Sequence, residues 1–176
     1  MAPHGRLSLV VRWAQFETQR PDLAEAGRAM LYQYGVGLAF LGTVRADGGP
    51  RLHPMCPLLM DGGLYAFLIQ SPKRDDLHRD PRYAIHTFPC DDNEDAFYIA
   101  GSAAPVRSEE TKRALGDLFV AERPGLAEVD FEAQEAFEFS VERCLWSTTT
   151  GHGDPDPSHV TWRAESVDPG QGKAPG

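Results

Sequence analysis

The residues best suited to chemistry lie in the segment Ser71-Pro72-Lys73-Arg74, which follows an apolar run and opens a short helical pattern. This segment places a hydroxyl, an ammonium and a guanidinium group at a helix N-terminus. Backbone N–H groups are unpaired at such an end, and the helix dipole favours an anion there. The segment therefore predicts a phosphate-binding turn. The alternative is an ordinary Ser-Pro helix start with a solvated charged face.

The stretch before this segment has the pattern of three short strands. Residues 36–45 and 51–60 flank a strong turn, Asp47-Gly48-Gly49-Pro50, and 64–70 follows a second turn. The connections are too short for parallel crossovers, so we expect an antiparallel meander. Pro54 and Pro57 lack N–H donors. The second strand should therefore be irregular or at a sheet edge, which leaves a gap that a ligand could approach.

The rest of the chain continues this mainly β pattern within one domain, residues 1–166. Further elements are expected as helices over 21–34, 71–80 and 108–124 and as strands over 83–88, 97–106 and 136–145. Six antiparallel strands with two or three peripheral helices favour a small barrel, because closure removes exposed edges. Residues 167–176 hold almost nothing to bury, so we expect a disordered C-terminal tail.

The run from Ser71 to Ile85, SPKRDDLHRDPRYAI, resembles the pyridoxamine 5′-phosphate oxidase family, in which a serine and a Lys/Arg pair bind the flavin phosphate. The hairpin around Asp47 also resembles the family's first hairpin, and together the likeness covers about residues 36–106. It implies an FMN-binding split β-barrel. Ser71 and Lys73 would then hold the phosphate, with Arg74 as a helper.

Other positions are similar to flavin contacts of the same family. His53 stands where the family often has an arginine, but histidine is shorter and mostly neutral at pH 7, so a packed strand histidine is the alternative. Trp146 resembles a tryptophan that lies against the flavin, with core or dimer packing as the alternative. Arg163 falls near a terminal arginine of the family. The expected cofactor-binding residues are His53, Pro54, Met55, Cys56, Gln70, Ser71, Lys73, Arg74, Trp146 and Arg163.

His152, Asp154, Asp156 and His159 form a cluster of side chains that are common metal ligands. Their spacing matches no standard metal-binding motif. They lie among Gly and Asp-Pro pairs, which usually form turns. We therefore interpret the segment as a loop and expect no metal.

The composition limits the classes of binding partner and the cellular compartment that we expect. The formal net charge is −9, with 26 acidic against 17 basic side chains, a balance that should repel nucleic acid and anionic membranes. No run approaches the roughly 20 apolar residues of a membrane span. The three cysteines form no CxxC pair and leave one unpaired under any disulfide scheme, which favours the cytoplasm.

From the family resemblance we expect a flavin-dependent oxidoreductase that acts on a small molecule. The resemblance implies a homodimer whose partner strands close the cofactor site. No G-x-S-x-G, Walker A or dinucleotide-binding glycine motif supports another enzyme class. The chain end also lacks the arginine–histidine pattern of the authentic oxidase, which argues against pyridoxamine phosphate as substrate. The alternatives are a reductase using the deazaflavin F420, or a non-enzymatic haem- or flavin-binding protein with His152 or His159 as haem ligand.

Overall fold

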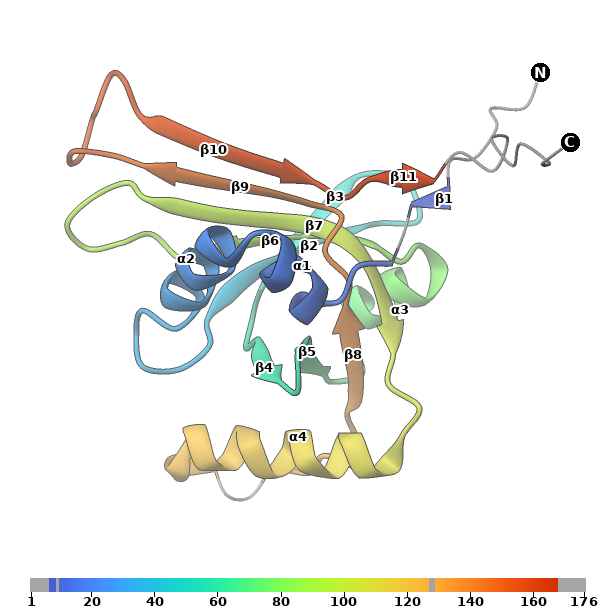
Figure 1. Ribbon diagram of the computed structural model, residues 1–176. Helices are drawn as coiled ribbons and strands as arrows, with labels where there is room; N and C mark the ends of the chain where they lie inside the picture. The colour runs from blue at the N-terminus through green and yellow to red at the C-terminus, as the bar shows by residue number, and fades with distance from the viewer. Residues whose placement is uncertain (1–6, 9, 127–128, 168–176) are drawn as a thin grey trace, which may run out of the picture.

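The computed structural model describes residues 7–8, 10–126 and 129–167, and its main feature is a strongly curled antiparallel sheet (Figure 1). Its nine strands are β2 (Ala39–Val44), β3 (Pro50–Met55), β4 (Leu58–Met60), β5 (Gly63–Leu68), β6 (Arg82–Thr87), β7 (Ala96–Pro105), β8 (Glu135–Phe139), β9 (Arg143–Thr148) and β10 (Ser158–Arg163). Two short strands, β1 (Leu7–Ser8) and β11 (Ser166–Val167), pair with each other. The first residue of the predicted tail is thus paired, and residues 168–176 lie outside the described residues.

The strand order explains how the sheet curls. Its path runs β3-β2-β6-β7-β8-β5-β4, and β9 and β10 add alongside the first half of β7. The strands at the two ends of this path, β3 and β4, are consecutive in the sequence, with only Cys56 and Pro57 between them. The prediction of one strand over 51–60 was therefore wrong. The strand breaks at Cys56-Pro57, whereas Pro54 lies within β3 and pairs with Phe40. β3 pairs with β2, β4 pairs with β5, and the chain crosses from one end of the sheet path to the other.

The strand predicted over 136–145 is also broken, into β8 and β9. The chain bends at residues 140–142, where the Ser140 amide donates to the carbonyl of Ser102 and the Val141 amide donates to that of Val11. A Cβ atom at Gly101 would lie 2.0 Å from the carbonyl oxygen of Ser140, so only glycine permits this approach. Two broken strands and the unpredicted β10 account for nine strands where six were expected.

Four α-helices lie around the sheet, compared with the two or three predicted. They are α1 (Trp13–Gln19), α2 (Pro21–Leu31), α3 (Pro72–Arg79) and α4 (Glu109–Glu122), and a 3-10 turn, η1 (Pro124–Leu126), follows the last. The unpredicted helix α1 has seven residues, and it buries Trp13 and Phe16, which lie three positions apart on one face. The predicted N-cap of α4 is confirmed, because the Ser108 side chain accepts a hydrogen bond from the Thr111 amide.

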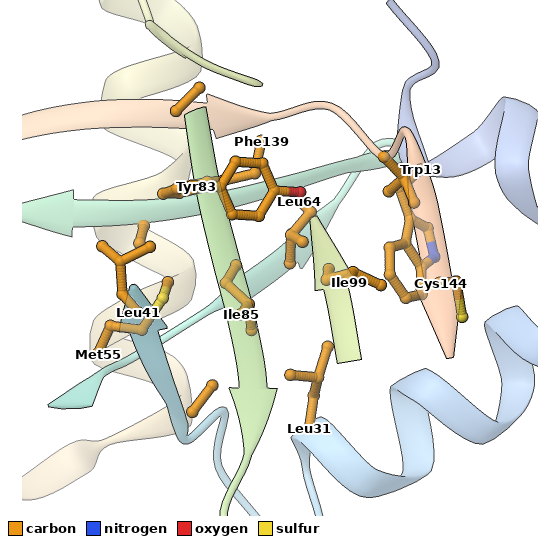
Figure 2. Close-up of a cluster of buried hydrophobic side chains, with 14 of the residues drawn as sticks. Trp13, Leu31, Leu41, Met55, Leu64, Tyr83, Ile85, Ile99, Phe139 and Cys144 are labelled. Carbon is orange, nitrogen blue, oxygen red and sulfur yellow. The ribbon is translucent and has the colours of Figure 1, made fainter. Parts of the chain in front are cut away.

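The larger core lies between α1, α2 and one face of the sheet. Leu41, Ile85, Ile99 and Cys144 pair in register across β2, β6, β7 and β9, and all four are buried (Figure 2). Leu31 of α2 joins this cluster. A smaller cluster lies under α4. In the part of the chain that the structure describes, no helix has the length and apolarity needed to cross a membrane.

Candidate functional site

The phosphate-binding turn predicted from the sequence joins β5 to α3. Ser71 is the N-cap residue of α3 with extended backbone, and Pro72 is the first helical residue. Proline is suited to this position because its missing N–H would have no partner there. The Ser71 hydroxyl donates to the carbonyl of Ile69 at 2.9 Å and does not cap the helix. An incoming phosphate would therefore need the Ser71 hydroxyl to turn away from Ile69.

Lys73 connects this turn to the other predicted segment, His53 to Cys56. Its Nζ donates to the carbonyl oxygen of Pro54 at 3.4 Å, next to the edge of the sheet that β3 forms. Burial lowers the pKa of Lys73, and the neighbouring Cys56 thiol acts in the opposite direction. Two segments about twenty residues apart in the sequence thus meet in space. We call residues 51–56 and 70–76 the β3–α3 corner.

A buried carboxylate holds this corner together. Asp76 of α3 is only 3% exposed, and it accepts hydrogen bonds from Thr43 Oγ1 at 2.9 Å and from Arg51 Nε at 2.6 Å. Arg79 Nη2 is a third donor, at 3.1 Å. Burial by itself raises the pKa of Asp76, but the hydrogen bonds from Arg51, Thr43 and Arg79 outweigh it and lower the pKa. Asp76 therefore fixes α3, and with it Lys73, against β2 and β3.

Arg74 points away from Lys73. Its Nε lies 3.8 Å from Oε2 of Glu135 at the start of β8, and His78 Nε2 lies 2.7 Å from the same oxygen. The Glu135 carboxylate thus offsets the charge of Arg74. Lys73, by contrast, has no carboxylate within ion-pair distance in the described part of the chain.

The remaining residues of the β3–α3 corner differ in exposure. His53 is half-buried and pairs with Leu41, on the side of β3 that also carries Arg51. Met55 is buried in the core, whereas Pro54 and Gln70 are exposed and Cys56 is half-buried. Exposed Pro54 and Gln70 are thus open to a ligand, while Met55 offers only its backbone.

Trp146 and Arg163 form a second group at the opposite end of the sheet, where Trp146 lies on the core face and Arg163 on the outer face. Trp146 of β9 pairs with Phe97 and Val160 and packs half-buried against the larger core. Arg163 is exposed at the end of β10. Strands β2, β6 and β7 separate β9 from β3, which at the usual strand spacing is about 19 Å along the sheet. Within one chain these residues do not join the β3–α3 corner.

Three of the four possible metal ligands, His152, Asp154 and Asp156, lie in the loop that connects β9 to β10, and one of the acidic residues stabilises the turn. Asp154 accepts hydrogen bonds from the Thr150 amide, the Thr150 hydroxyl and the Asp156 amide. His152 Nε2 lies 3.2 Å from the carbonyl oxygen of Asp91, and His159 is exposed on β10. The Asp154 contacts agree with the turn interpretation of this segment.

Comparison with known proteins identifies the fold. No protein-family model and no curated protein matches the sequence. Solved structures do match. A haem-binding protein from Mycobacterium smegmatis superimposes with a TM-score of 0.61 at 19% identity, over 81% of this chain and 59% of that protein. This chain therefore spans less than two thirds of that protein.

Two further structures connect the fold to the family that the sequence resembles. A Clostridium acetobutylicum protein related to general stress protein 26, of the pyridoxinephosphate oxidase family, has a TM-score of 0.59 at 16% identity over 82% of this chain and 95% of its own. A NimC/NimA family protein from the same organism has a TM-score of 0.56 at 15% identity, over 80% and 94%. This chain therefore has the split β-barrel fold of these structures.

The predicted fold class is thus confirmed. The structure also identifies residues of the site that the sequence interpretation missed. Asp76, Arg51 and Thr43 were not predicted as parts of the site, although they position Lys73. No local signal distinguishes Asp76 from its neighbour Asp75, which is exposed on the same helix. The matching arginine, 25 residues earlier, could be assigned only once the sheet register was known.

Proposed function

We propose that the split barrel binds FMN at the β3–α3 corner and acts as a flavin-dependent oxidoreductase on a small molecule. The observation that carries this proposal is the position of Lys73. It is a cation without a carboxylate partner in the described chain, held at the start of α3 and against the edge strand β3. The neighbouring cations Arg51, Arg74 and Arg79 all face carboxylates. Lys73 is thus the cation at this corner that is available to a phosphate.

Residues in and next to the corner offer a flavin both apolar surface and backbone polar groups. An exposed Ile69, 59% accessible, and an exposed Leu52, 64% accessible, offer apolar surface to a flat ring. The backbone of Pro54, Met55 and Cys56 lies at the sheet edge, where polar groups can meet the ring edge. FMN, when bound, supplies hydride or electron transfer through its isoalloxazine ring. The residues of this chain would hold and orient the ring, Lys73 through the phosphate and Asp76 by fixing α3.

We further propose that the active form is a homodimer. Its support is the separation of the two predicted groups, because Trp146 and Arg163 lie about 19 Å along the sheet from β3. A second copy would bring Trp146 to the corner of its partner and cover the exposed Leu52 and Ile69. Sedimentation at micromolar concentration should therefore show a dimer. A monomer with cofactor bound would contradict the arrangement.

The unpaired cysteines support a cytoplasmic location.

The absorption spectrum of the purified protein is the first test of the cofactor. FMN gives paired bands in the blue and near ultraviolet, F420 a single violet band, and haem a Soret band. F420 carries a long acidic tail that needs a basic groove, and the net charge of −9 and the acidic loop 91–95 oppose one. Likeness to the mycobacterial haem-binding protein favours haem as the second candidate. A Soret band that His152→Ala or His159→Ala abolishes would replace the flavin proposal.

Substitution of Lys73 tests the site itself. A phosphate held by Lys73 should lose charge-assisted hydrogen bonds of roughly 1.5–3 kcal/mol in Lys73→Ala, so affinity for FMN should fall by about one to two orders of magnitude. Riboflavin, which lacks the phosphate, should bind the variant almost as well as it binds the parent protein. Added salt should weaken FMN binding more in the parent than in the variant. Equal losses for FMN and riboflavin would place the phosphate elsewhere.

A further inference from the structure

A groove lies on the sheet face opposite α1 and α2, at the end formed by β7, β9 and β10. It has a volume of about 470 Å³ and is lined by side chains of Tyr98, Arg143, Leu145, Thr161 and Arg163. The intervening residues Cys144 and Trp162 point to the other face, where Trp162 packs against Phe16 of α1. Figure 1 shows α1 and α2 on one side of these strands. The side chains of the groove therefore face away from the core.

Two arginines face each other across this groove. Arg143 and Arg163 are register partners on β9 and β10, and both are exposed. Directly opposite side chains in an antiparallel pair have Cβ atoms about 5 Å apart, and like charges in that arrangement are destabilising. In residues 7–8, 10–126 and 129–167 neither arginine has a carboxylate within ion-pair distance, unlike most arginines of the chain. In the described chain, no ion pair offsets this repulsion.

Besides the two arginines, the groove contains hydroxyl donors and apolar surface that a small anionic molecule could contact. Tyr98, Leu145 and Thr161 are register partners in the neighbouring row and share the face of the two arginines. Tyr98 and Thr161 carry hydroxyl donors, and Leu145 and the Tyr98 ring offer apolar surface. Guanidinium groups present paired N–H donors whose geometry matches the oxygens of a phosphate or carboxylate. A bound oxyanion would accept hydrogen bonds from both arginines and remove their repulsion.

We propose that this groove binds the phosphate or carboxylate group of a small molecule between Arg143 and Arg163. The site is distinct from the β3–α3 corner of the same chain, because β2 and β6 lie between β7 and β3. The proposal does not depend on FMN. It assigns Arg163 to an anion site that it shares with Arg143, a residue that the sequence patterns did not single out.

Calorimetry and thermal unfolding of the full chain, with inorganic phosphate and malonate as separate probes, test this site. Phosphate presents phosphate oxygens and malonate presents carboxylate oxygens. The probe that binds more tightly indicates which class of ligand the groove takes. At least one should bind the parent protein saturably and raise its unfolding temperature. Arg143→Gln and Arg163→Gln should each weaken that binding at least about tenfold, since a charge-assisted hydrogen bond is lost. Without any anion, Arg143→Gln should unfold at a higher temperature than the parent, because the like-charge repulsion is gone.

Two control variants make the result specific. Arg107→Gln removes an exposed arginine that also has no carboxylate partner in the described chain but lies outside the groove, between β7 and α4. Lys73→Ala removes the cation of the β3–α3 corner. Arg107→Gln should bind the probe as the parent does, and Lys73→Ala should keep the binding event that Arg143→Gln removes. The absence of saturable binding, or an equal loss in Arg107→Gln, would overturn the groove proposal. Loss in Lys73→Ala alone would assign the binding to the corner.

Discussion

The β3–α3 corner and the β9–β10 end of the sheet differ in whether their charged side chains have partners of opposite charge. At the corner, Asp76 is buried and accepts hydrogen bonds from Thr43, Arg51 and Arg79. At the other end, Arg143 and Arg163 are exposed, adjacent and without a carboxylate partner in the described chain. A compensated buried charge holds elements together, whereas uncompensated exposed charge is available to a ligand. Lys73 combines both situations, since it is an uncompensated cation on a helix that a compensated carboxylate fixes.

The largest effect should come from removing the compensated carboxylate. Asp76→Ala leaves Arg51 without its partner in a partly buried site, so the free energy of unfolding should fall by about 3–5 kcal/mol. Urea unfolding monitored by circular dichroism measures the change. Asp75→Ala is the matched control, because Asp75 is an exposed neighbour on the same helix, and it should change stability by no more than about 0.5 kcal/mol. Similar losses in the two variants would mean that Asp76 does not anchor the corner.

The stability of the protein at low pH should depend on the same carboxylate, that of Asp76. The folded-state pKa of Asp76 lies below its ordinary value of 3.8, so its stabilising contribution is present above about pH 4 and is lost as the pH falls through the folded-state pKa. Each unit of pKa difference corresponds to about 1.4 kcal/mol. The stability of Asp76→Asn should therefore decline less steeply below pH 4 than that of the parent protein. Urea midpoints between pH 2 and pH 5 measure the slopes.

A comparison variant identifies the source of the slope. Hydrogen bonds from Arg82 lower the pKa of Asp80 to about 2, so Asp80 titrates in the same acidic range. Asp80→Asn should keep the part of the decline in stability below pH 4 that comes from protonation of Asp76. If Asp76→Asn kept the full parent slope and Asp80→Asn lost it, the acid sensitivity would belong to the Asp80–Arg82 pair.

A smaller effect is expected from the second group of predicted cofactor residues. Trp146→Ala should weaken FMN binding by about 1–2 kcal/mol through lost stacking, if a second copy brings Trp146 to the β3–α3 corner. Quenching of flavin fluorescence measures the dissociation constant. An unchanged dissociation constant together with reduced stability would assign Trp146 to core packing alone.

The smallest effect on stability should be that of Lys73→Ala. The ammonium group makes one hydrogen bond of 3.4 Å, and burial lowers its pKa, so its charge adds little to the folded state. The free energy of unfolding without ligand should change by no more than about 0.5 kcal/mol. Chemical unfolding of cofactor-free protein checks this value. A loss comparable to that of Asp76→Ala would make Lys73 a structural residue and weaken the contrast between the two.

The sequence by itself determined the local elements and the fold class. The helix cap at Ser108, the turn at Asp47-Gly48 and the edge position of the proline-containing strand β3 follow from rules that act within a few residues, and the structure has all three. The sequence also placed Lys73 at the start of a helix. It did not find α1, because two buried aromatic residues in seven positions are too weak a signal without the sheet beneath them.

Only the tertiary structure decided which distant residues meet. The bend between β8 and β9 depends on Gly101, about forty residues earlier, and the partner of Asp76 lies on another strand. Arg143 and Arg163 face each other because β9 and β10 pair in one particular register, which places both side chains on the outer face. Strand register is set by the whole sheet and its buried face, and a shift of one residue would reverse every side chain. For that physical reason, neither the anchor at Asp76 nor the arginine groove could be derived from local sequence patterns.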